Sequence, residues 1–274
     1  MMNLQSSNPV LAGSDANELF RTGGEGARAV ADTATVQGVV NKTTFLALLA
    51  TGAGCVGWAV CSAFPAALWI ANIAALVVVL GIFFALRGNP ARAMFLGPIY
   101  SVVEGFLLGG VAVMLQGILT AQGIEVPGGI ALQAFVVTIA ILLSMLTLYS
   151  LGVLKGGQTF TRILSVATLG IFLMYLISFV IGFFGISMPF LSLGSAMEGG
   201  TSAMIGLGIN VLILGVASLW FIVDFRQVED LVASGAPKRM EWYAAFGLMV
   251  TLAWVYFEAL KLVFRLALLF GRRD

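Results

Sequence analysis

Three carboxylic acids lie inside strongly apolar stretches of this 274-residue chain. Glu104 stands within IYSVVEGFLLGG, Asp224 within WFIVDFRQVED, and Glu258 within AWVYFEALKLVFRL. If these stretches cross a membrane, each charge is costly, so the acids face a bundle interior, pair with another group or take up a proton. Burial raises the pKa of a carboxyl group, and two acids forced together share a proton. Such a pair is suited to sensing protons or to holding a hard cation such as calcium.

The composition places the chain in lipid. Hydrophobic residues make up 60% and charged residues 10%, with a mean hydropathy of +1.03, whereas soluble domains carry about 25% charged residues. The net charge of +1 argues against a nucleic-acid partner. There is no histidine, which removes the commonest metal ligand and general base, and no HExxH or Gly-x-Ser-x-Gly stretch occurs. The sequence therefore predicts a membrane protein that is not an enzyme.

Apolar stretches long enough to span a bilayer recur along the chain. We predict an all-α, polytopic bundle of seven transmembrane helices at 43–63, 67–86, 94–116, 129–150, 162–184, 202–224 and 242–270. Glycines at small-residue spacing, such as Gly105 with Gly109, favour close helix packing. Residues 1–41 are polar and predict a mobile aqueous arm ahead of a transmembrane domain at 42–274.

Basic residues indicate the orientation of the bundle. They occur in the arm and in every second loop, at Arg28, Lys42, Arg87, Arg92, Lys155, Arg162, Arg226, Lys238 and Arg239. The positive-inside rule then places the N-terminus in the cytoplasm. Seven spans put the C-terminus outside, although it carries Lys261, Arg265, Arg272 and Arg273. Either the last segment crosses despite these charges, or it turns back.

Each acid also has a purely structural interpretation. Glu258 has Lys261 three residues on and Arg265 seven residues on, so an ion pair along the helix would neutralise it. Asp224 ends its predicted span two residues before Arg226 and could be solvated there. Glu104 has no basic residue within seven positions, and its structural alternative is a hydrogen bond to a neighbouring helix. Glu198 is expected in an outer loop.

Depth allows Asp224 and Glu258 to meet. Glu258 lies sixteen residues beyond the start of its apolar run, or about 24 Å along a helix. The run of 29 residues would be about 43 Å long, which exceeds a hydrocarbon core of about 30 Å. If its first two turns project into the cytoplasm, Glu258 lies about 12 Å inside the membrane, within reach of a buried Asp224.

The order of these features resembles the Bax inhibitor-1 (transmembrane Bax inhibitor motif) family over most of residues 40–270, and the bacterial branch in particular. VDFRQ is similar to the family's Asp-containing turn after the sixth helix, and VYFEALKLVF to its acid-bearing last helix. YSVVEGFLLGG resembles an acid-bearing early helix of the family. This chain departs from the family in having Glu at 258, and in a longer stretch between the two acids.

The resemblance implies a passive, pH-sensitive calcium leak in a bacterial plasma membrane. It implies that the last helix is central and that Asp224 and Glu258 form a hydrogen-bonded dyad that gates and holds calcium. Glu104 would be an acid of the pathway, and Lys261, Arg265 and Arg226 would be charge partners. Calcium is then the transported ion, and no cofactor is expected. The alternatives are a proton-coupled transporter of a small solute and a non-transporting regulator with a membrane protease as its partner.

Overall fold

The computed structural model describes residues 33–182, 184–185, 188 and 194–271. Within these residues seven helices are long and apolar enough to cross a membrane. They are α2 (Val36–Ala63), α3 (Ala66–Gly88), α4 (Ala93–Ala121), α5 (Gly129–Ser150), α6 (Gln158–Gly182), α8 (Gly200–Ala233) and α9 (Glu241–Phe270). Short helices η1 (Pro90–Arg92), α7 (Gly194–Glu198) and η2 (Lys238–Met240) occur between them. The prediction of an all-α, seven-span protein is confirmed.

The first helix begins earlier than the sequence predicted. Thr35 caps α2, because its Oγ1 accepts a hydrogen bond from the backbone N of Gly38 at 2.9 Å. The helix therefore starts at Val36, inside the segment assigned to the aqueous arm. A span predicted from hydropathy counts only apolar residues, and it misses a polar first turn that a cap stabilises. Residues 1–32 of the predicted arm lie outside the described residues.

Glycines let α2 and α4 touch backbone to backbone. A Cβ atom added at Gly105 would lie 2.1 Å from the carbonyl oxygen of Ala50, and one at Gly109 would lie 1.9 Å from that of Gly54. No side chain fits at such distances. Lipid gives helices no hydrophobic reason to associate, so close packing of small residues supplies the attraction. The close approach predicted from the spacing of Gly105 and Gly109 is confirmed.

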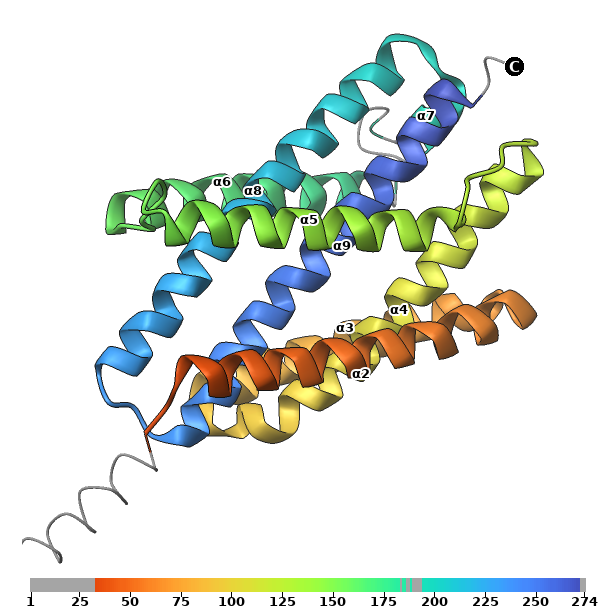
Figure 1. The fold of residues 1–274 in the computed structure, drawn as a ribbon. Helices are drawn as coiled ribbons and strands as arrows, with labels where there is room; N and C mark the ends of the chain where they lie inside the picture. Colours follow the sequence, from red (N-terminus) through yellow and green to blue (C-terminus); the bar gives the residue numbers. More distant parts are fainter. Residues whose placement is uncertain (1–32, 183, 186–187, 189–193, 272–274) are drawn as a thin grey trace, which may run out of the picture.

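The last helix, α9, lies at the centre of the bundle. It packs against α2, α4, α5 and α8, and it runs obliquely through the molecule in Figure 1. In the most apolar 18-residue stretch of this span, 61% of the residues are buried inside the protein, against at most 44% in the corresponding stretch of any other described span. The expectation that the last helix is central is confirmed, because protein encloses a larger share of α9 than of any other described span.

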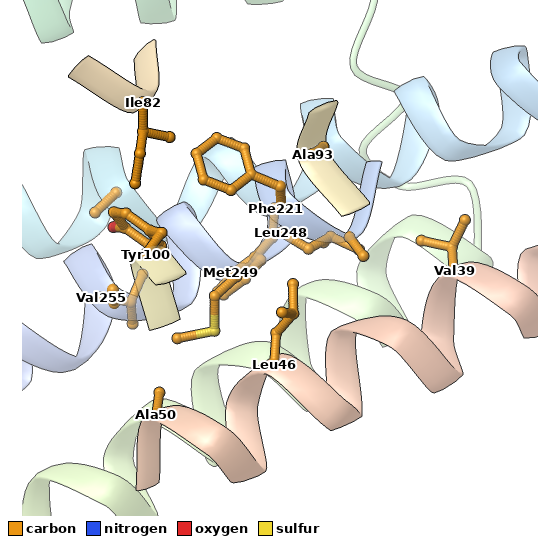
Figure 2. Close-up of a cluster of buried hydrophobic side chains, with 14 of the residues drawn as sticks. Val39, Leu46, Ala50, Ile82, Ala93, Tyr100, Phe221, Leu248, Met249 and Val255 are labelled. Carbon is orange, nitrogen blue, oxygen red and sulfur yellow. The ribbon is translucent and has the colours of Figure 1, made fainter. Parts of the chain in front are cut away.

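Large side chains pack around the first half of α9. Figure 2 shows Tyr100, Phe221, Leu248 and Met249 gathered there. The rings of Tyr100 and Phe246 meet edge to face, with centroids 5.2 Å apart. Such aromatic contacts add to the stabilisation that burial provides. This packing fixes the depth of α9 relative to α4 and α8, and with it the level of every polar residue on α9.

The C-terminal charges do not make α9 turn back. The helix is continuous over 30 residues, which is about 45 Å and enough to cross the bilayer. Lys261 and Arg265 are only 8% and 3% exposed, so they belong to the bundle interior and not to a loop. These two basic residues therefore no longer argue against a C-terminus on the outer side of the membrane. Arg272 and Arg273 lie outside the described residues.

Candidate functional site

Asp224 is buried between α8 and α9. It was expected to end its helix, yet α8 continues for more than two turns to Ala233. The side chain is 8% exposed, and its Oδ2 accepts a hydrogen bond from Thr251 Oγ1 at 2.6 Å. A fully solvated Asp224 is therefore excluded. The contact joins the central helix to its neighbour through one carboxylate and one hydroxyl.

Glu258 lies deeper along α9 in a separate polar cluster. It is 1% exposed, and its Oε1 is 2.7 Å from Lys261 Nζ. Its Oε2 accepts a hydrogen bond from Asn210 Nδ2 of α8 at 2.7 Å. The same Asn210 nitrogen lies 3.2 Å from the backbone oxygen of Glu258. The charge of Glu258 is thus balanced by a lysine on its own helix, and its side chain is held in place by an amide of the neighbouring helix α8.

The ammonium of Lys261 is held on several sides. Its Nζ donates a hydrogen bond to the hydroxyl of Tyr175, on α6, at 2.8 Å. It also lies 4.8 Å from the ring centroid of Phe257, which is within the range of cation–π attraction. A carboxylate, a phenol oxygen and one aromatic face together make an ammonium-binding cluster.

The other predicted site residues lie apart from these two acids. Glu104 is half-buried on α4, and no hydrogen bond or ion pair within the described chain joins it to either acid. Arg226 points away from Asp224: its Nη1 donates to the backbone oxygen of Lys155 at 3.0 Å, and its Nε lies 3.6 Å from Asp230 Oδ2. Arg265 is buried on α9, one turn beyond Lys261.

Comparison with known families decides the identity. The family described as "Bax inhibitor 1 like" matches residues 8–267, a range that includes Glu104, Asp224 and Glu258. The chain belongs to the Bax inhibitor 1 like family. A search of curated proteins finds no match. The family resemblance inferred from VDFRQ and VYFEALKLVF is therefore confirmed, whereas the roles of individual residues have to be argued from their contacts.

In the described part of this Bax inhibitor 1 like protein, no hydrogen bond joins the two acids. Asp224 meets Thr251 and Glu258 meets Asn210 and Lys261. Thr251 and Glu258 are seven residues apart on α9, or about 10 Å along the helix axis. The resemblance implied direct contact, but the stretch between the acids is long and the packed first half of α9 brings Thr251 level with Asp224 instead.

Calcium takes six to eight oxygen ligands. Within the described ranges no group of three or more His, Cys, Asp or Glu side chains could hold a metal ion. Asp224 and Glu258 therefore belong to no larger cluster of acids, and their role as calcium ligands stays a prediction.

A third buried acid was missed in the sequence. Glu241, the first residue of α9, is 0% exposed and forms an ion pair with Lys42 of α2. It also accepts hydrogen bonds from the backbone N and the Oγ1 of Thr35, at 2.9 and 3.2 Å. A Cβ at Gly38 would lie 2.2 Å from Glu241 Oε1, so the glycine makes room for the carboxylate. The sequence feature that could have indicated this ion pair is Lys42, a basic residue at the start of an apolar stretch with no acid close to it in the sequence.

Proposed function

We propose that this protein is a passive, pH-sensitive calcium leak of the bacterial plasma membrane, with its N-terminus in the cytoplasm. Family membership and seven membrane-spanning helices support a membrane role. The observation that carries the proposal is Asp224, a buried carboxylate between α8 and the central helix α9 that accepts its hydrogen bond from a hydroxyl and not from a basic side chain. A buried carboxylate without a basic partner is stabilised when it binds a proton or a cation, because either neutralises its charge.

Protonation of Asp224 changes the bond that it makes. As a carboxylate it accepts only, and the Thr251 hydroxyl must donate to it. As a carboxylic acid it can donate, and the hydroxyl can accept. The contact between α8 and α9 therefore differs between the two protonation states. We propose that this difference makes the leak sensitive to pH and that calcium, the transported ion, needs no energy source or cofactor.

Calcium flux into dye-loaded liposomes tests this function. The purified protein and its Asp224→Asn and Glu258→Gln variants are compared from acidic to mildly alkaline pH. We expect the wild type to leak calcium in a pH-dependent manner and Asp224→Asn to leak at a rate that no longer varies with pH. Asparagine still accepts the Thr251 hydrogen bond through its amide oxygen, so the fold is retained. Wild-type flux no greater than that of empty liposomes would exclude the leak.

A second candidate is a proton-coupled transporter of a small apolar solute. A cavity of about 950 Å³ lies among α2, α4, α5 and α9, lined mainly by apolar side chains that include Trp58, Leu132 and Phe135. This volume is in the range of small-molecule sites. Under this candidate a solute would evoke a proton current that Asp224→Asn abolishes. Under the leak, calcium would move without any solute.

A further inference from the structure

Glu258 already has a cation at its carboxylate. Lys261 Nζ lies 2.7 Å from Oε1, and the amide of Asn210 bonds the other oxygen, so both carboxylate oxygens are engaged. The lysine and the glutamate are both nine-tenths buried or more. Lys261 is three residues from Glu258 on the same helix, so the cation is tethered next to the acid and cannot diffuse away.

The cluster is built for an ammonium ion. The Tyr175 hydroxyl oxygen at 2.8 Å and the ring of Phe257, with its centroid at 4.8 Å, complete the surroundings of Lys261 Nζ. The face of an aromatic ring attracts an ammonium ion through the ring quadrupole. Calcium instead requires a shell of oxygen ligands. While Lys261 is in place, the cluster therefore has no position for a second cation.

Removing the lysine would leave oxygen atoms facing the vacated position. Glu258 Oε1 and the Tyr175 hydroxyl would lose their ammonium partner. Both are oxygen atoms within 2.8 Å of the position that the ammonium now takes. A carboxylate and a phenol oxygen are donors that can attract a small cation, with water supplying its other ligands.

We propose that Lys261 is a tethered plug: its ammonium occupies the place that a transported cation would take at Glu258, and cations reach this acid only when the lysine side chain swings away. The role of Lys261 in transport rests on the proposed calcium leak. The binding of its ammonium in the cluster does not depend on that proposed function. Lysine suits this role because its ammonium is carried on a flexible four-carbon stem.

Chemical rescue tests the cluster without any flux measurement. In Lys261→Ala the missing part of the side chain has the shape of n-propylammonium. We expect n-propylammonium chloride to raise the Tm of Lys261→Ala more than that of the wild type. The matched controls are 1-propanol, which lacks the charge, sodium chloride at the same ionic strength, and the double variant Glu258→Gln/Lys261→Ala. An equal rise in all three proteins, or no rise in Lys261→Ala, overturns the ammonium cluster.

Flux measurements test the plug. Lys261→Met keeps most of the stem, and we expect it to leak cations several-fold faster than the wild type. Glu258→Gln/Lys261→Met should not show this gain, because the acid that attracts the cation is gone. Lys155→Met removes the same charge from an exposed loop and should leak like the wild type.

The outcomes separate the plug from the leak itself. A wild-type rate in Lys261→Met overturns the plug, and so does an equal gain in the double variant, since that indicates a loosened bundle. If the wild type and every variant fail to conduct, the proposed function is wrong and the transport statement falls with it. The rescue of Lys261→Ala then still decides whether the cluster binds an ammonium. If Lys261→Ala does not fold, the flux of Lys261→Met decides the plug.

Discussion

Thr251 Oγ1 and Asp224 Oδ2 lie 2.6 Å apart, and their hydrogen bond links the central helix α9 to α8. Both residues are buried. An acid of α8 therefore meets a neutral hydroxyl at the level where a second acid was expected. The proposed pH response consequently resides in one carboxylate and its hydroxyl, and Glu258 belongs to a different, charge-balanced cluster.

Thr251→Val tests this hydrogen bond with little change in side-chain volume. A hydrogen bond to a charged group contributes about 1.5 to 3 kcal/mol, so we expect the Tm to fall. The Thr251 hydroxyl favours the ionised form of Asp224 because it donates to the carboxylate. Its removal should therefore move the pH response of the leak to higher pH. Thr251→Ser keeps the hydroxyl and should restore both properties. An unchanged Tm and pH response in Thr251→Val would show that the contact is unimportant.

Glu258→Gln should destabilise the protein more than Asp224→Asn does. Glutamine leaves the Lys261 ammonium buried without its carboxylate. Breaking a buried ion pair from one side costs about 3 to 5 kcal/mol. Removing both charges in Glu258→Gln/Lys261→Met should recover much of this loss, and thermal unfolding of the four proteins in the cycle measures it. Additive losses in the double variant would contradict a direct coupling.

Gly38→Ala tests the contact between the start of α2 and Glu241. A Cβ at this position would lie 2.2 Å from Glu241 Oε1 and would displace the carboxylate from Lys42 and Thr35. We expect a lower Tm. Gly52→Ala is the control on the same helix, because nothing lies within 4 Å of its Cβ. There alanine should stabilise the helix by about 0.5 to 1 kcal/mol. A change in Tm of the same sign for Gly38→Ala and Gly52→Ala would contradict the contact.

Gly109→Ala tests the seam between α2 and α4. The added Cβ would lie 1.9 Å from the carbonyl oxygen of Gly54, so the helices must separate. Overpacking of this kind costs about 1 to 3 kcal/mol. Gly117→Ala, also on α4, meets nothing within 4 Å and should not destabilise. Thermal unfolding of the two variants in detergent gives the comparison, and equal Tm values would argue against the seam.

The sequence by itself determined the features that depend on composition and local spacing. Long apolar stretches require helices in lipid, because every backbone polar group there must be bonded within its own segment. The spacing of Gly105 and Gly109 marked a close helix contact, and an acid such as Glu258 inside an apolar run marked a buried polar site. Lys261 could be named as its partner because both residues lie on one helix, three positions apart.

Only the tertiary structure decided which residues of different helices meet. Asp224 bonds Thr251 rather than Glu258, Asn210 reaches Glu258 from 48 residues away, and Lys42 pairs with Glu241 across 199 residues. These contacts depend on how far one helix is shifted along another, and a shift of one turn, about 5.4 Å, replaces every partner. That shift is fixed by the packing of large side chains around α9, which no local pattern in the sequence encodes.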